Sequence, residues 1–378
     1  MRAFLVVTDS VGCGGAPDAA AFGDEGADTL GHIHARVGLS LPNLTKLGLA
    51  QIVPGMSGPA EGLYGVAREH SPGKDTPTGH WELSGVPVPW DWHYFPTSEP
   101  SFPAEITQAV AAFCETDGVL GNCHASGTEI VDRLGETHMQ TGQPICYTSA
   151  DSVFQIAAHE GSFGLNRLYA LCEHIAPKLH DMKVGRVIAR PFVGETRAEF
   201  QRTKNRRDYA IETPAPTLLD WAQADGRRTY AVGKISDIYS GRGIDESVKG
   251  TDAQLMDQLE RLTREAVGGS FTFANFVEFD ALYGHRRDPE GYARHLEWFD
   301  GQLPRLFANL QDDDLMIFTA DHGNDPTRHG TDHTREEVPV LGFGVGHKPI
   351  GQVDFVDVAA SIARYLMLET QGPGRSFL

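Results

Sequence analysis

The chain has 378 residues, 40% of them hydrophobic, and its 51 acidic side chains against 32 basic ones give a net charge of −19. This length predicts a sizeable core and more than one domain. The acidic balance argues against general nucleic-acid binding and against docking on an anionic membrane, because both need basic surface.

The cysteines and the start of the sequence predict the compartment. There are five cysteines and no two form a C-x-x-C pair, so a disulfide framework is not expected. The first apolar run is too short for a secretory signal, and no window approaches the length of a membrane span. These features predict a soluble, cytoplasmic protein.

Strand-like and helix-like segments alternate along most of the chain. Residues 3–7 form a continuous apolar run, which predicts a strand buried on both faces and ending at Asp9. The later segments are a helix over 251–269 capped by Thr251, a strand over 270–280, a helix over 289–310 that Pro304 kinks or breaks, strands over 314–321 and 338–344, and a helix over 356–368. This alternation predicts an α/β fold with a mostly parallel sheet between helices.

The middle of the chain has a different composition. It opens with a stretch rich in proline and aromatic residues and ends in a charged stretch with few apolar residues. Helices are expected near 104–116, 129–135 and 166–178, and strands near 119–125, 143–150 and 184–194. We therefore expect residues 94–212 to form an inserted, smaller α/β cap domain. Residues 1–93 and 213–378 would then be the two parts of the core.

Three of the predicted strands end in an aspartate, namely Asp9, Asp280 and Asp321. Because ligands of parallel α/β sheets lie beyond the carboxyl ends of the strands, these three carboxylates can converge. The histidines near them in the sequence are His285, His322 and His333. Mixed carboxylate and imidazole sets suit manganese, zinc or iron, so the six residues are candidate metal ligands.

Charge favours two cations over one at such a site. Three carboxylates carry −3 and two divalent ions +4, which leaves +1 for a phosphate dianion, whereas a single ion would leave the site negative. Taken singly, each aspartate could be a turn residue or a helix cap, and each histidine an ordinary core or surface group. Asp325, His329 and Asp332 lie in the same loop, and their spacing does not exclude them as ligands.

The stretch SPGKDTPTGHWELSG, residues 71–85, offers an acceptor for a phosphoryl group. A hydroxyl has a high pKa, so coordination to a metal is an economical way to activate it. Thr76 and Thr78 both qualify. The local sequence equally fits a surface turn with a capping threonine, so the residues alone do not decide.

Several segments together resemble bacterial phosphopentomutases of the alkaline-phosphatase superfamily. They include GKDTPTGHWE at 73–82, EFDALYGHRRD at 278–288, TADHGNDPT at 319–327 and GTDHTREEVP at 330–339, and the similarity extends to the closing GRSFL. The ADHG sequence is shared across the superfamily, whereas the first two segments in combination are specific. The resemblance implies an alkaline-phosphatase-like core.

The resemblance also implies an activity. It is the interconversion of ribose 1-phosphate and ribose 5-phosphate, and of the 2-deoxyribose pair, through a phosphothreonine at Thr76 and a pentose 1,5-bisphosphate. The implied cofactors are two Mn(II) ions and an activating bisphosphorylated sugar, either glucose 1,6-bisphosphate or ribose 1,5-bisphosphate. One ion would be held by Asp9, Asp321, His322 and Thr76, and the other by Asp280, His285 and His333.

A mutase must keep water away from its phosphothreonine, so the cap is expected to close as a lid. The expected substrate contacts are Ser149, Asp151, Arg186, Ile188 and Lys234. Arg186 and Lys234 suit the distal phosphate, and Asp151 suits a sugar hydroxyl, although Arg186 and Asp151 could instead be an ordinary surface ion pair. Arg286 and Arg287 either anchor their own loop or touch the substrate.

Three other functions fit parts of the pattern. A hydrolase of the same superfamily would use the same metals and release inorganic phosphate. A metal-dependent phosphoglycerate mutase shares the metal ligands but uses a serine, which the KDT sequence does not fit. A metal-storing or sugar-phosphate-binding protein would hold metal without turnover. The expected partners are small pentose phosphates, with no nucleic acid and no membrane, and the sequence leaves the oligomeric state open.

Overall fold

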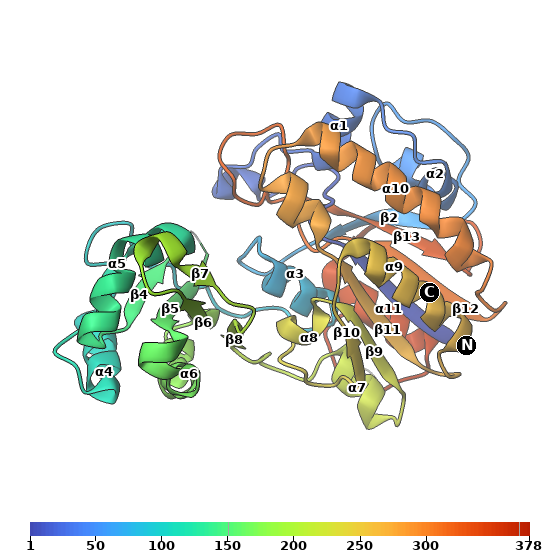
Figure 1. Cartoon of the computed structure of the whole chain (residues 1–378). Helices are drawn as coiled ribbons and strands as arrows, with labels where there is room; N and C mark the ends of the chain where they lie inside the picture. The colour runs from blue at the N-terminus through green and yellow to red at the C-terminus, as the bar shows by residue number, and fades with distance from the viewer. Residues whose placement is uncertain (150, 370) are drawn as a thin grey trace. The chain divides into compact units, whose positions relative to one another are not determined.

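The computed structural model describes residues 1–149, 151–369 and 371–378. These residues form two compact units, each with its own sheet (Figure 1). The core unit comprises Met1–Pro89 and Thr213–Leu378, and the inserted unit comprises Trp90–Glu212. Among the helices of the described ranges, none combines the length and the apolar character needed to cross a bilayer.

The core unit is built on an eight-stranded sheet. In sheet order its strands are β10 (Glu246–Val248), β9 (Thr229–Gly233), β11 (Phe271–Phe276), β1 (Arg2–Thr8), β12 (Asp314–Thr319), β13 (Val338–Phe343), β2 (Leu63–Arg68) and β14 (Lys348–Asp354). β13 pairs antiparallel with both of its neighbours, and the other pairs of this sheet are parallel. The predicted mostly parallel sheet is therefore confirmed.

Helices cover both faces of this sheet. Phe273 and Phe276 of β11 lie three positions apart and so point to opposite faces. The Phe276 ring contacts Phe299 of α10, whereas the Phe273 ring contacts His80 of α3 and Tyr239. The helices on the side of α10 are α1 (Thr29–Val37), α2 (Pro42–Leu47), α9 (Asp252–Glu265) and α10 (Pro289–Phe307). Those on the side of α3 are α3 (Thr76–Leu83), α7 (Leu218–Ala224), α8 (Ile235–Ile238) and α11 (Phe355–Tyr365).

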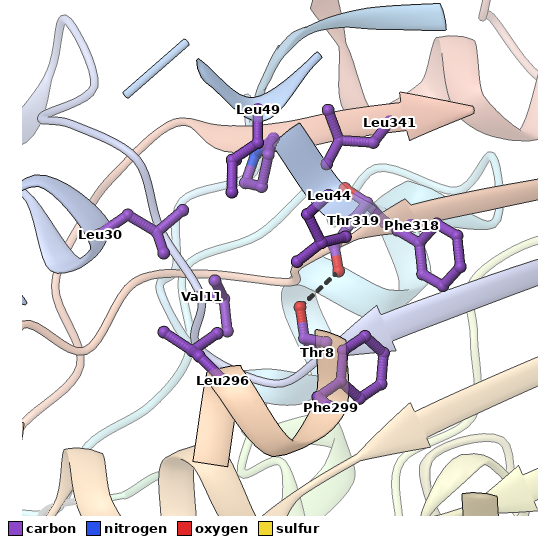
Figure 2. Close-up of a pocket in the computed structure, with 11 residues that line it drawn as sticks. Thr8, Val11, Leu30, Leu44, Leu49, Leu296, Phe299, Phe318, Thr319 and Leu341 are labelled. Atoms are coloured by element: carbon purple, nitrogen blue, oxygen red, sulfur yellow. Dashed lines mark hydrogen bonds between the residues drawn. The ribbon is translucent and has the colours of Figure 1, made fainter. Parts of the chain in front are cut away.

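A small apolar cavity lies between the sheet and the helices on the side of α10 (Figure 2). Leucine and phenylalanine side chains dominate its lining, and the hydroxyl of Thr8 is turned to the carbonyl of Thr319 at 3.1 Å. Its volume of about 20 Å³ is enough for roughly one water molecule. The cavity is therefore a packing gap and not a substrate site.

The structure corrects one sequence prediction for the core and excludes one of the two alternatives given for Pro304. β11 ends at Phe276, and Asp280 lies beyond it in a π-helical turn, η5 (Phe279–Gly284). α10 is not broken at Pro304 but continues to Phe307. A proline lacks the N–H that would bond the carbonyl four residues earlier. Here that carbonyl belongs to Asp300, and it accepts a hydrogen bond from Asn43 Nδ2 at 3.0 Å instead. The missing backbone hydrogen bond therefore costs the helix little stability.

The inserted unit has a mixed six-stranded sheet. Its strands are β3 (Leu120–His124), β4 (Ile145–Thr148), β5 (Val153–His159), β6 (Arg186–Val193), β7 (Gln201–Arg202) and β8 (Arg207–Ala210). Its α-helices are α4 (Ala104–Cys114), α5 (Gly127–Thr141) and α6 (Leu165–Asp181). The three helices and three strands expected here are present, although Ala150, at the end of one predicted strand, lies outside the described residues. β5 was not predicted, and it pairs with both β4 and β6.

His138 of α5 gives the inserted unit a pH-dependent stability. Its buried ring donates from Nδ1 to the Gln143 carbonyl at 2.6 Å and accepts at Nε2 from the His159 N–H at 2.9 Å. Burial lowers the pKa of His138, so the folded state holds the neutral form. The unfolded chain binds this proton more readily, so stability is fully present above pH ~6.5 and falls as the pH drops below that value.

His138→Gln is therefore expected to reduce the loss of stability between pH 7.5 and pH 5.5. Some pH dependence will remain, because burial also lowers the pKa of His180 in α6. Hydrogen–deuterium exchange of α5 and β5 at the two pH values measures the effect. His174→Gln, at an exposed position of α6, is the matched control and should keep the slope of the unmodified protein.

Candidate metal centre

Six side chains meet at the carboxyl edge of three adjacent parallel strands. β1 lies between β11 and β12 and pairs parallel with both. The turns after these strands therefore leave the sheet at one edge and bring Asp9, Asp280 and Asp321 together. The three histidines are His285 after η5, His322 after β12 and His333 in the loop before β13.

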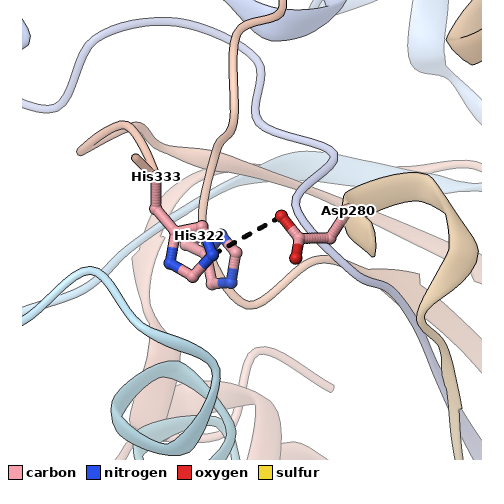
Figure 3. A group of neighbouring side chains, drawn as sticks. All are labelled: Asp280, His322 and His333. Carbon is pink, nitrogen blue, oxygen red and sulfur yellow. Dashed lines mark ion pairs between the residues drawn. The ribbon is translucent and has the colours of Figure 1, made fainter. Parts of the chain in front are cut away.

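Nε2 of each imidazole lies close to a carboxylate oxygen. His322 Nε2 is 3.5 Å from Asp9 Oδ1 and 3.3 Å from Asp321 Oδ2. The Asp280 carboxylate lies near the other two imidazoles: His285 Nε2 is 3.0 Å from Oδ2, and His333 Nε2 is 3.5 Å from Oδ1. The rings of His322 and His333 stack with their centroids 3.9 Å apart, beside the Asp280 carboxylate (Figure 3). All six predicted ligands thus belong to one connected cluster.

The other nitrogen of each ring shows which atoms carry hydrogen. In His285, Nδ1 lies 2.5 Å from the carbonyl oxygen of Thr331. In His322 it lies 3.1 Å from that of Gly323, and in His333 it lies 2.8 Å from that of Lys74. A carbonyl oxygen only accepts, so each Nδ1 carries a hydrogen, and a neutral ring then has a bare lone pair at Nε2. Nε2 of His285 and Nε2 of His333 face each other at 3.2 Å, where two hydrogens would clash.

Lone pairs directed at carboxylates and at one another repel unless a cation lies between them. Ligand atoms bonded to one such ion at about 2.1 Å lie roughly 3.0–3.4 Å apart. The separations in the cluster, 3.0–3.5 Å, are close to this spacing, so the residues present fit metal ions. Metal-ligating histidines usually donate their other N–H to a carbonyl or a carboxylate, as all three do here.

A comparison group in the same unit lacks this pattern. Asp252, Glu278 and His295 also bring three possible ligand atoms together, and His295 Nε2 lies 2.9 Å from Asp252 Oδ2. In the described part of the chain, Nδ1 of His295 has no carbonyl partner, so Nε2 is free to carry the hydrogen and donate it to Asp252. That hydrogen bond accounts for the group without a metal.

The electrostatics of the main cluster also call for positive charge. Burial, together with the charges of Asp321 and Asp280, raises the pKa of Asp9 well above its ordinary value. Burial lowers the pKa of His322 to about 4. Asp9 Oδ1 is buried and has no hydrogen-bond partner among the described residues. A bound divalent cation would relieve both the repulsion and the missing contact.

Further residues orient the ligands, and sequence reasoning missed them. Asn275 Nδ2 donates to Asp9 Oδ2 at 2.9 Å, and Asn324 Nδ2 donates to Asp280 Oδ1 at 2.6 Å. The backbone N–H of Ser10 donates to Asp321 Oδ1 at 3.1 Å. The signal for Asn275 was present in the sequence, because an amide inside the apolar run of β11 needs a buried polar partner.

Thr76 opens α3 and lies beside the cluster. Its Oγ1 is 3.4 Å from His322 Nε2, and the residue is 6% exposed. Thr78 Oγ1 instead donates to Asp75 Oδ2 at 2.8 Å, as part of the N-cap of the same helix. Of the two candidate threonines, Thr76 is therefore the one whose hydroxyl reaches the predicted ligands.

Gly79 allows α3 to approach the predicted metal centre closely. A Cβ atom at this position would lie 2.0 Å from the carbonyl oxygen of Asp321. Any other residue would push the first turn of α3, which carries Thr76, away from the end of β12. This close approach explains why the second glycine of GKDTPTGHWE cannot be replaced by a larger residue without moving the helix.

A half-buried arginine fixes one of the loops around the cluster. Arg287 donates to the carbonyls of Gly284, Gly330 and Asp332, at 2.9, 2.6 and 2.8 Å. It thus anchors the loop behind His285, whereas Arg286 is exposed. The other loop candidates point elsewhere: Asp325 pairs with His32, Asp332 is exposed beside Lys74, and His329 is exposed.

The five predicted substrate contacts lie in both units. Lys234 is the N-cap residue of α8 in the core unit. Its positive charge acts to lower the pKa of Asp9, but the opposite effect of burial is larger. In the inserted unit, Arg186 forms a loose ion pair with Asp151 at 3.6 Å. Ile188 is buried in β6, and Ser149 is half-buried just after β4. Their contact with a substrate stays a prediction.

Comparisons with known proteins agree with this description. The family model described as "Metalloenzyme superfamily" matches residues 1–370. Phosphopentomutases of Rhizobium leguminosarum bv. trifolii and Agrobacterium fabrum are 53% and 50% identical to the chain, each with full coverage of both sequences. That of Chromohalobacter salexigens is 53% identical, covering 100% of this chain and 96% of its own. The solved structure of the PH0037 protein from Pyrococcus horikoshii is 13% identical, with a TM-score of 0.50 over 98% of this chain and 97% of that one, and it supports the fold alone.

The fold and the site define a metal-dependent α/β enzyme of the Metalloenzyme superfamily, and the predicted alkaline-phosphatase-like fold class is confirmed. Full-length identity of 50% and more is decisive at the finer level. The chain belongs to the phosphopentomutase family, as the resemblance in its sequence indicated.

Proposed function

We propose that this protein interconverts ribose 1-phosphate and ribose 5-phosphate, and the corresponding 2-deoxyribose phosphates. Relatives that carry the name phosphopentomutase match it over its whole length. One observation supports the chemistry most directly: three imidazole lone pairs converge on buried carboxylates next to the Thr76 hydroxyl.

The proposed cofactors are two Mn(II) ions. Asp9, Asp321 and His322 would hold one of them with Thr76. Asp280, His285 and His333, whose imidazole Nε2 atoms lie at the Asp280 carboxylate, would hold the other. When bound, the ions would neutralise phosphoryl oxygens and favour the alkoxide form of the threonine.

The proposed reaction proceeds in two transfers. Phosphorylated Thr76 gives its phosphoryl group to the free hydroxyl of a pentose monophosphate, which releases a proton and becomes a 1,5-bisphosphate. Thr76 Oγ1 then attacks the other phosphorus in line, the bond from that phosphorus to the sugar oxygen breaks, and the oxygen takes up a proton. A bisphosphorylated sugar, glucose 1,6-bisphosphate or ribose 1,5-bisphosphate, would charge the threonine initially.

We propose that the inserted unit supplies contacts to the sugar and excludes water during these steps. Arg186, with its fork of donors, suits the phosphate that does not react, and Lys234 of the core unit would add charge. Ser149, Asp151 and the backbone at Ile188 would contact the sugar. Exclusion of water matters because water would otherwise hydrolyse the phosphothreonine.

Phosphorus NMR tests the proposal. The manganese-loaded protein is incubated with ribose 5-phosphate and glucose 1,6-bisphosphate, and the expected result is a growing ribose 1-phosphate signal. Inorganic phosphate appearing at the same rate would favour a hydrolase. Retention of metal with no change in the spectrum would favour a storage or binding protein.

A further inference from the structure

His80 of α3 occupies a position that the metal ligands alone do not explain. The residue is fully buried, one helical turn after Thr76, with its ring against Phe273. Its Nδ1 lies 2.9 Å from the carbonyl oxygen of Thr76 and 3.1 Å from Oδ2 of Asp321. One imidazole nitrogen therefore contacts both the residue that carries the proposed nucleophile and a predicted metal ligand.

The neighbours of His80 fix its tautomer. The Thr76 carbonyl oxygen accepts only, so Nδ1 carries a hydrogen and donates it to that carbonyl, and Asp321 Oδ2 lies beside the same N–H at 3.1 Å. Nε2 of the neutral ring then has no hydrogen, and it is buried without a partner in the described structure. A buried polar atom without a partner is destabilising. An apolar side chain would avoid that cost, so the N–H at Nδ1 is the feature that distinguishes histidine here.

The two oxygens of Asp321 are held from different sides. Oδ1 accepts from the Ser10 N–H, whereas Oδ2 faces both His80 Nδ1 and His322 Nε2. Oδ2 is therefore the oxygen directed at the cluster, and the polar N–H of His80 lies in contact with it. We propose that His80 is a positioning residue, which ties the metal-facing oxygen of Asp321 to the first turn of α3 and so fixes its spacing from the Thr76 hydroxyl. This inference rests on the proposed roles of Thr76 and Asp321.

Two replacements of His80 test the inference. His80→Leu removes the donor and keeps an apolar side chain, whereas His80→Asn places an amide N–H near the position of Nδ1. Since loss of such an outer contact typically costs 10–100-fold in metal affinity or activity, His80→Leu is expected to bind Mn(II) at least about tenfold more weakly. Its kcat should fall while KM for ribose 5-phosphate stays within about twofold, and His80→Asn should recover most of the Mn(II) affinity.

The matched control is Tyr239→Phe. The Tyr239 hydroxyl donates to the backbone carbonyl of His80 at 2.6 Å, so its removal disturbs the packing but leaves the imidazole in place. This variant should melt at a lower temperature and bind Mn(II) normally. His80→Met is a second apolar replacement in case the leucine variant does not fold.

Manganese affinity, measured by equilibrium competition with a fluorescent chelator, decides the outcome. The inference is overturned if His80→Leu binds Mn(II) as tightly as the unmodified protein. It is also overturned if His80→Leu and His80→Asn lose Mn(II) affinity equally and in step with their loss of melting temperature. If the unmodified protein has no mutase activity, the proposed function fails, but the affinities of the variants still decide the role of His80.

Discussion

Thr76→Ala is expected to keep most of its bound metal and to lose mutase turnover by a factor on the order of 10⁴ or more. Without the hydroxyl there is no atom to accept the phosphoryl group, whereas the carboxylates and imidazoles of the cluster are untouched. Turnover of ribose 5-phosphate, metal content and intact mass are the measurements. After treatment with the bisphosphate activator, the unmodified protein should gain the mass of one phosphoryl group and the variant should not.

Thr78→Val is the matched control for this experiment. The Thr78 hydroxyl donates to Asp75 Oδ2, so its removal costs about 1 kcal/mol. The backbone N–H of residue 78 still donates to Asp75 Oδ1, and the proposed nucleophile stays in place. Turnover should persist at moderate temperature. Full activity in Thr76→Ala, together with loss in Thr78→Val, would transfer the proposed role to Thr78.

Asp280→Asn is expected to lower the bound manganese from two ions per chain to one and to reduce turnover at least ~10³-fold, since an ion contributes several kcal/mol to the transition state. Both oxygens of Asp280 face imidazole nitrogens, His285 at 3.0 Å and His333 at 3.5 Å. An amide in its place has no charge, and its N–H can donate to one of those lone pairs, so it competes with the metal. Metal analysis after gel filtration and the turnover assay measure both effects.

Asp252→Asn provides the comparison, because Asp252 belongs to the group whose histidine is free to donate its own hydrogen. This variant should keep two ions per chain and its turnover. If the unmodified protein binds a third ion that Asp252→Asn removes, the tautomer criterion used to separate the two groups is wrong. If Asp280→Asn retains two ions, Asp280 is not a ligand.

The convergence of the predicted ligands could be predicted because of a general property of parallel sheets. Asp9 and Asp321 follow strands that are recognisable as apolar runs, and strands of this kind deliver the residues after them to one edge. Asp280 was predicted to end its strand, whereas a π-helical turn separates it from β11. The resemblance to phosphopentomutases, and not spacing, distinguished Thr76 from Thr78.

The groups that hold the ligands in place could not be predicted in the same way. His80 and Asn275 contact the cluster only because α3 and β11 adopt a particular register against β12 and β1, and that register is set by packing over long sequence distances. The antiparallel direction of β13 was missed for a similar reason. Its apolar run has the same pattern in either direction, and the pairing partners β12 and β2 decide the direction.

The place of β1 between β11 and β12 has a consequence for biosynthesis. Ala3 pairs with Phe271 on one side and Leu315 on the other, so the first strand to leave the ribosome must wait for partners translated near the end. Residues 90–212, by contrast, are contiguous and hold all the strands of their own sheet. We expect this segment to fold during translation, while the exposed apolar β1 depends on chaperones until β12 emerges.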